Sequence, residues 1–171
     1  MKTKTIITTV LAFALGIGLL VVGYNKNGNT LASVQGVSTT TEKSELIVSE
    51  TLYDFGTVSM KNGNVTKDFT LTNTTDRDAM VSRIETSCMC TSAYIVEPDG
   101  TNKGPFGMPG HGGVVPPANE IIPAGESRII RVVYDPNAHG PAGVGKIDRF
   151  ITITDSSGGS LRLEIKALVT P

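Results

Sequence analysis

Apolar and polar residues alternate along short stretches of this chain, and turn-forming residues separate the stretches. Phe69 and Leu71 alternate with polar neighbours in residues 65–72, and residues 146–154 and 161–167 show the same period of two. Such alternation is typical of β-strands with one buried face. The polar turn at residues 155–159 joins the last two stretches and predicts a hairpin there.

Stretches of this kind recur along most of the chain. They fall at residues 45–49, 53–58, 65–72, 79–84, 93–96, 127–134, 146–154 and 161–167. About seven short strands with turns at this spacing are typical of an all-β sandwich. Residues 99–119 are rich in glycine and proline and are expected to form an irregular loop insert within a β domain that covers residues 44–171.

The N-terminus carries a long apolar run without charge, from Ile6 to Val22, preceded by Lys2 and Lys4. Its length lies between a signal-peptide core, about 7–15 residues, and a membrane-spanning helix, about 17–25. Residues 1–24 are therefore predicted to form one hydrophobic helix that contacts the membrane. The length favours an uncleaved anchor, and a weak small-residue cleavage site leaves a cleaved signal open. In both cases the lysines stay inside, so the domain is expected on the extracytoplasmic side, secreted or periplasmic after cleavage.

Composition and net charge give three further expectations, for the linker, for the class of partner and for the core. Residues 25–43 are rich in Asn, Gly, Ser and Thr, which predicts a flexible linker. The 171-residue chain has a net charge of −1, so nothing favours nucleic acid or anionic lipid as a partner. With no Trp, four Tyr and five Phe, the core is expected to be mostly aliphatic.

Both cysteines of the chain lie in the segment Cys88-Met89-Cys90. In extended backbone, residues two apart point to the same side, so two thiolates would lie side by side with Met89 facing the other way. A one-residue spacer makes a tight ring for a disulfide. The spacing therefore favours a chelating thiolate pair over a disulfide.

Strand direction predicts which side chains join this pair. If strands alternate in direction, residues 79–84 and 127–134 end at the same pole of the sandwich, so Cys88, Cys90 and His139 share that pole. The insert is expected to start there as well, and its Met108 and His111 could fold back towards the cysteines. Thiolate, thioether and imidazole are ligands that suit Cu(I). The sequence thus predicts a soft-metal site, with copper as the concrete metal, in which the two thiolates are the primary ligands. One imidazole or thioether from His139, His111 or Met108 completes its three or four ligands.

Two other functions stay open at this stage. An exported Cys88–Cys90 disulfide would be readily reduced, which would make the domain a thiol–disulfide redox module. Alternatively, the domain is a non-catalytic scaffold at the cell envelope that binds a protein partner. Ser127 lacks the Gly-X-Ser-X-Gly context of a hydrolase nucleophile. We predict that the chain is not an enzyme.

Several segments, in this order, resemble a known bacterial family. They are Tyr-Asp-Phe-Gly-Thr-Val at 53–58, Phe-Thr-Leu-Thr-Asn at 69–73, Ile-Glu-Thr-Ser-Cys-Met-Cys-Thr at 84–91, Ile-Pro-Ala-Gly-Glu-Ser at 122–127, Val-Val-Tyr-Asp at 132–135 and Ile-Thr-Ile-Thr at 151–154. The chain resembles the domain-of-unknown-function family DUF1573, a relative of the Hydin-type (ASH) Ig-like domains.

The resemblance implies an extracytoplasmic domain without an established activity, and it completes the expected fold class. That fold class is all-β: an Ig-like antiparallel β-sandwich of about seven strands, preceded by one N-terminal hydrophobic helix. Many members of the family carry Cys-Gly-Cys-Thr where this chain has Met89 between the cysteines. The insert at residues 99–119 also looks longer than the family needs.

Overall fold

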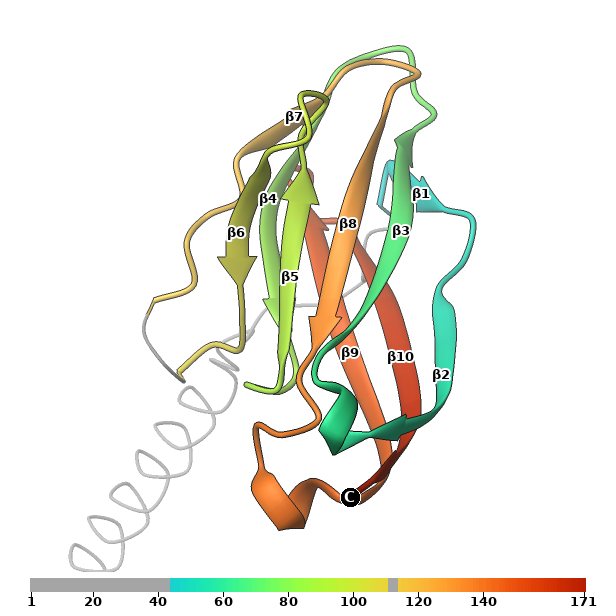
Figure 1. The fold of residues 1–171 in the computed structure, drawn as a ribbon. Helices are drawn as coiled ribbons and strands as arrows, with labels where there is room; N and C mark the ends of the chain where they lie inside the picture. Colours follow the sequence, from blue (N-terminus) through green and yellow to red (C-terminus); the bar gives the residue numbers. More distant parts are fainter. Residues whose placement is uncertain (1–43, 111–113) are drawn as a thin grey trace, which may run out of the picture. The chain divides into compact units, whose positions relative to one another are not determined.

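Two facing sheets of five strands each make up the part of the chain that the structure describes, residues 44–110 and 114–171 (Figure 1). The structure is a computed structural model. The first sheet has the order β1-β3-β8-β5-β6 and the second the order β2-β10-β9-β4-β7. The predicted anchor at residues 1–24 and the predicted linker at residues 25–43 lie outside the described residues.

The strand bounds are as follows. The first sheet contains β1 (Leu46–Val48), β3 (Val65–Asn73), β8 (Ser127–Tyr134), β5 (Thr91–Val96) and β6 (Asn102–Phe106). The second contains β2 (Leu52–Ser59), β10 (Ser160–Thr170), β9 (Gly145–Asp155), β4 (Ala79–Thr86) and β7 (Glu120–Ile122). Two short 3-10 turns, η1 (Met60–Asn62) and η2 (Gly140–Gly143), are the helical elements of the described residues.

The predicted fold class is wrong in its strand number and in its pairing. The described residues form ten strands, not about seven, and the sandwich is not wholly antiparallel. Strand β2 pairs parallel with β10, in a register that runs from Leu52 opposite Glu164 to Ser59 opposite Thr170. The N-terminal hydrophobic helix of that prediction falls on residues that the structure does not describe. Within the described residues, no helix has the length and apolar character needed to cross a membrane.

The additional strands arise in and beside the insert. Strand β6 lies within the predicted irregular loop and pairs antiparallel with β5 at the edge of its sheet. It contains Gly104 and Pro105, and proline is tolerated in strands chiefly at an edge, so the composition of β6 predicts a loop. Strand β7 pairs with β4 over three residues, which is too short for an alternating pattern to be recognised.

The core lies between the sheets and is mostly aliphatic. Its largest fully buried side chains are Tyr134, Phe69, Phe106, Leu46, Leu71, Ile84, Ile95, Ile122, Ile130, Ile151, Ile153 and Leu163. Burial of a side chain of this size contributes about 1.5–3 kcal/mol. Packing of the two inner faces therefore holds the sandwich together. It also fixes the ends of β4 and β8, which are followed by the cysteine turn and by the segment that contains His139.

Candidate thiol and metal centre

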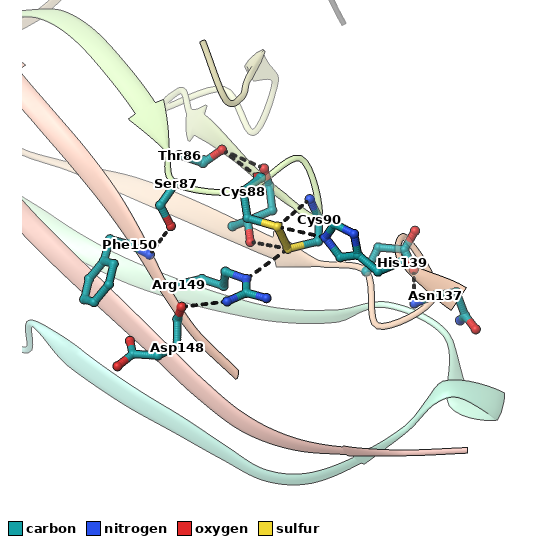
Figure 2. The surroundings of a disulfide bond; sticks show 11 residues. Thr86, Ser87, Cys88, Cys90, Asn137, His139, Asp148, Arg149 and Phe150 are labelled. Atoms are coloured by element: carbon teal, nitrogen blue, oxygen red, sulfur yellow. Dashed lines mark hydrogen bonds between the residues drawn. A yellow bond between two sulfur atoms is a disulfide. The ribbon is translucent and has the colours of Figure 1, made fainter. Parts of the chain in front are cut away.

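The two cysteines lie in the turn that joins β4 to β5, and the structure joins them by a disulfide (Figure 2). Their Cα atoms are 5.2 Å apart. The expectation that this spacing favours a chelating pair over a disulfide assumed extended backbone. Residues 87–90 instead bend, and the amide of Thr91 donates to the carbonyl of Cys88 at 3.1 Å. The bend brings the two sulfur atoms together.

Neighbouring strands hold this turn from several sides. The buried hydroxyl of Thr86 lies 3.0 Å from the carbonyl oxygens of both Cys88 and Thr91. Ser87 exchanges two hydrogen bonds with the backbone of Phe150 on β9: its amide donates to the carbonyl, and its hydroxyl accepts from the amide, each at 2.9 Å. These contacts pair backbone groups of the turn and tie it to β4 and β9 at the end of the sandwich.

His139 is brought to the disulfide by the strand that precedes it. Strands β4 and β8 point towards the same end of the domain, where the C-terminus also lies (Figure 1). The chain after β8 turns there, and Nε2 of His139 lies 3.2 Å from Sγ of Cys88. The two sulfurs and one imidazole nitrogen all lie within 4.8 Å of one another. Of the candidate ligands, the structure thus brings Cys88, Cys90 and His139 together.

The insert reaches this end by a route other than the one expected. It does not start beside the cysteines, because β5 runs away from them and β6 brings the chain back (Figure 1). The amide of Thr86 then donates to the carbonyl of Gly107 at 3.1 Å, next to the cysteine turn. Met108 follows and is half-buried. His111 lies outside the described residues, and a ligand role for it or for Met108 stays a prediction.

Arg149 is a member of this centre that the sequence analysis missed. Its Nε–H donates to Sγ of Cys90 at 3.2 Å, and its Nη1 donates to the carbonyl of Asp148 at 2.9 Å (Figure 2). The positive charge of Arg149 also acts on the buried Tyr134. Burial raises the pKa of Tyr134, and the charge of Arg149 opposes that shift. The disulfide therefore lies between a guanidinium on one sulfur and an imidazole on the other.

The two cysteine residues are both buried, but they differ slightly in exposure. Cys88 is 8% exposed and Cys90 is 2% exposed, whereas Met89 between them is 56% exposed. His139, which contacts Cys88, is itself exposed. The turn thus shows a thioether to solvent and keeps its disulfide just beneath the surface, with Cys88 on the more open side.

The described residues define an Ig-like β-sandwich domain. Residues 46–103 match the model of a family described as protein of unknown function (DUF1573). This match confirms the resemblance that the sequence motifs predict. No curated protein matches the chain.

Solved structures show the same fold at low identity. A protein of unknown function from Porphyromonas gingivalis W83 aligns with a TM-score of 0.54 and 15% identity, over 77% of this chain and 50% of that one. The chain therefore spans half the length of that protein. A family 123 glycoside hydrolase from Clostridium perfringens aligns with a TM-score of 0.51 and 7% identity, over 70% of this chain and 23% of the hydrolase.

A third alignment is with the ASH/PapD-like domain 7 of human CEP192, at a TM-score of 0.47 and 11% identity, over 75% of this chain and 87% of that domain. Identities this low show the fold alone. The hydrolase among these proteins therefore carries no implication of catalysis. The prediction that this chain is not an enzyme stays a prediction.

Proposed function

We propose that the domain is an extracytoplasmic binding module that holds Cu(I) through Cys88, Cys90 and His139 when the disulfide is reduced. The observation that supports this is the convergence of two sulfurs and an imidazole nitrogen within 4.8 Å, from segments about 50 residues apart in sequence. Soft thiolate ligands suit Cu(I) and zinc, and imidazole suits both metals. The donor set therefore fits a soft metal ion, and Cu(I) is the ion that we propose.

The three donor atoms would have to spread apart to hold a metal, and the two sulfurs would move most because the disulfide joins them. Sγ of Cys88 and Nε2 of His139 are 3.2 Å apart. Reduction breaks the bond between the sulfurs, so the same side chains can spread around an ion while their backbone stays tied by Thr86 and Ser87.

The positive charge of Arg149 would offset the negative charge of a copper–thiolate site. Two thiolates and one Cu(I) leave a net charge of −1, and the guanidinium hydrogen-bonded to Cys90 compensates it. Met108 follows Gly107 next to the cysteine turn, and its thioether is the proposed additional ligand from the described part of the insert. His111 keeps its predicted role as an alternative ligand.

The proposed setting is the outer side of a membrane. The uncharged run from Ile6 to Val22 behind Lys2 and Lys4 supports export, with the membrane as the partner of that segment. A copper-binding domain in this setting would sequester the ion at the envelope or deliver it to another protein there.

Titration of the reduced full-length protein, in detergent, with Cu(I) in competition with a chromogenic Cu(I) chelator tests the proposal. We expect one ion per chain. Cys88→Ser and His139→Ala should each lower the affinity by at least about tenfold, because each removes a ligand. Met89→Leu is the matched control, since it changes an exposed thioether in the same turn and should leave the affinity unchanged. Binding that survives in Cys88→Ser, or no competition with the chelator, would contradict the proposal.

A further inference from the structure

The two sulfurs of the disulfide have different neighbours, and the difference is chemical as well as spatial. Cys90 is 2% exposed, and its sulfur accepts a hydrogen bond from the Nε–H of Arg149 at 3.2 Å. The hydroxyl of Thr91 lies 3.7 Å from the same sulfur. Cys88 is 8% exposed, and its sulfur contacts the exposed imidazole of His139 and accepts a hydrogen bond from the amide of Cys90 at 3.2 Å. The guanidinium of Arg149 therefore lies on the sulfur of the less exposed cysteine, while the sulfur of Cys88 contacts a surface side chain and a backbone amide.

We propose that this disulfide takes part in thiol–disulfide exchange with small thiols in a fixed direction, with Cys88 as the attacked sulfur and Cys90 as the leaving group. The thiolate of a small thiol forms a new S–S bond with Sγ of Cys88. The Cys88–Cys90 bond breaks, and its electron pair stays on Sγ of Cys90 as a thiolate. No atom is lost, and the outcome is a mixed disulfide on Cys88.

Arg149 is the positioning residue that fixes this direction. Exchange is faster when the departing sulfur is stabilised as a thiolate. The guanidinium of Arg149 already donates to Sγ of Cys90 before the bond breaks. The developing negative charge is therefore met by a hydrogen bond that needs no rearrangement.

A second small thiolate completes the reduction. It attacks the sulfur of the small thiol in the mixed disulfide, and Sγ of Cys88 leaves as a thiolate. The amide of Cys90, which already donates to Sγ of Cys88 at 3.2 Å, can stabilise this thiolate. The small thiol is oxidised to its disulfide, and the cysteine pair is reduced by two electrons. This exchange reaction does not depend on copper binding. It does produce the reduced cysteine pair that copper binding needs.

The size of the loop argues against a purely structural disulfide. A disulfide stabilises a protein mainly by closing a loop in the unfolded chain, and the effect grows with loop length. This one encloses only Met89, because its cysteines are two residues apart. The turn is also held by Thr86 and Ser87 without it. The bond can therefore open without loss of the fold.

Reduction of the oxidised full-length protein by reduced glutathione, with a metal chelator present, tests the role of Arg149. The folded wild type should be reduced, and Arg149→Gln should slow the reaction by about tenfold, because a hydrogen bond to a charged sulfur is lost. Arg83→Gln is the control, since Arg83 is exposed on β4 and pairs with Glu85. Resistance of the folded wild type to glutathione, or equal rates in Arg149→Gln and wild type, would overturn the proposal. Since no copper is present, failure of the copper titration leaves this result unaffected.

Trapping of the mixed disulfide tests the direction of attack. The oxidised wild type is exposed briefly to reduced glutathione, the reaction is quenched with acid, and the freed thiol is alkylated. Fragmentation mass spectrometry then locates the glutathione and the alkyl group. Glutathione on Cys88 and the alkyl group on Cys90 is the expected result, and the reverse placement would overturn the proposal.

Discussion

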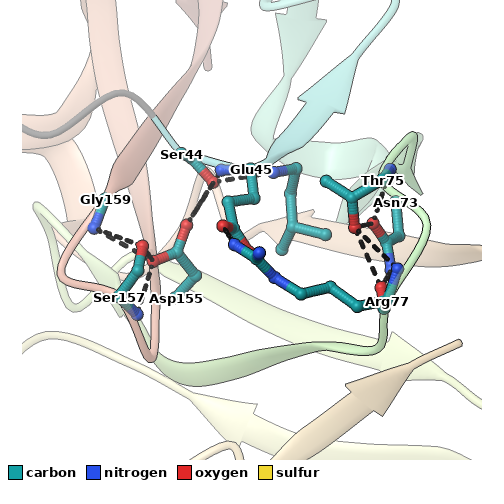
Figure 3. A network of polar contacts seen from close by, with 9 residues as sticks. Ser44, Glu45, Asn73, Thr75, Arg77, Asp155, Ser157 and Gly159 are labelled. Carbon is teal, nitrogen blue, oxygen red and sulfur yellow. Dashed lines mark hydrogen bonds and ion pairs between the residues drawn. The ribbon is translucent and has the colours of Figure 1, made fainter. Parts of the chain in front are cut away.

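The hydroxyl of Ser44 donates a hydrogen bond of 2.7 Å to the buried carboxylate of Asp155, across 111 residues of sequence (Figure 3). The bond connects the start of β1, in one sheet, to the end of β9, in the other. The same carboxylate accepts from the hydroxyl of Ser157 at 2.5 Å and from the amide of Gly159 at 3.0 Å. One side chain therefore organises the β9–β10 turn and fixes the first described residue of the domain against it.

Replacement of Asp155 by Ala should lower the free energy of unfolding by about 3 kcal/mol, because it leaves buried donors of Ser44 and Gly159 without an acceptor. Urea unfolding followed by circular dichroism measures the change. Asp76→Ala is the matched control, because Asp76 is an exposed turn residue. That control should change the free energy by less than about 0.5 kcal/mol. Equal stability of Asp155→Ala and the wild type would show that the carboxylate does not hold this junction.

Gly159 should not tolerate a side chain. A Cβ atom there would lie 2.6 Å from Cα of Ser44 and 2.9 Å from Oδ2 of Asp155, distances that real side chains do not show. Gly159→Ala should therefore lower the melting temperature through steric displacement of the Ser44 backbone, at a cost of about 1–3 kcal/mol. At Gly107 a Cβ would meet nothing within 4 Å, so Gly107→Ala is the control and should melt close to the wild type. An unchanged melting temperature for Gly159→Ala would contradict the packing described here.

Because of Glu120, the free energy of unfolding should fall as the pH is lowered into the acid range. Its buried carboxylate lies 3.0 Å from Nζ of Lys103 and 2.9 Å from Nε of Arg128. Burial alone would raise the pKa of Glu120, but hydrogen bonds from Lys103 and Arg128 outweigh burial and hold the pKa below its usual 4.5. The stabilisation is therefore complete above the unfolded-state value and is lost as pH falls through the lower folded-state pKa.

At pH 7, Glu120→Gln should lower the free energy of unfolding by about 1–3 kcal/mol, and the difference from the wild type should shrink at pH 3. Glu97→Gln is the contrasting variant. Burial and the neighbouring charge of Glu120 raise the pKa of Glu97, so its contribution to stability is lost as pH rises. Glu97→Gln should accordingly be no less stable than the wild type at pH 7. A Glu120→Gln deficit of the same size at both pH values would contradict the assignment.

Thr86 should be needed for the position of the cysteine turn. Thr86→Val keeps the shape of the side chain but removes the buried hydroxyl that lies 3.0 Å from the carbonyls of Cys88 and Thr91. We expect a loss of about 1–2 kcal/mol in the free energy of unfolding, measured by urea titration of the oxidised protein. Thr70→Val, at an exposed position of β3, is the control. A loss no larger than that of the control would show that the backbone contacts of Ser87 are sufficient.

Local patterns predicted much of this fold because most strands bury only one face. The alternation of Phe69 and Leu71 corresponds to β3, and the predicted hairpin at residues 146–167 corresponds to β9 and β10. The parallel pairing of β2 with β10 could not be predicted in this way, since it joins strands from opposite ends of the domain. Nothing in either stretch alone specifies its partner.

At the candidate site, spacing found the cysteines and strand direction found His139, but Arg149 was missed. A signal was present in the sequence. Ile147, Ile151 and Ile153 are buried on β9, and Arg149 has the same phase in the alternation, so a charged residue occupies a position that points inwards. The same reasoning applies to Asp155, which the sequence presents as an ordinary turn residue. Charged groups that break the pattern of a strand are thus the positions to examine first.

The parallel pair β2–β10 also determines how the domain responds to force. Leu52 begins β2, Thr170 ends β10, and the hydrogen-bonded register extends from one to the other. If the chain is pulled outwards before Leu52 and after Thr170, β1 is first pulled away from β3, and β2 and β10 then slide along each other. All hydrogen bonds of the ladder are then loaded in shear and must break together, not one after another. Forced unfolding depends on the height of this barrier, so a domain held at one end and engaged at the other would transmit tension before it extends.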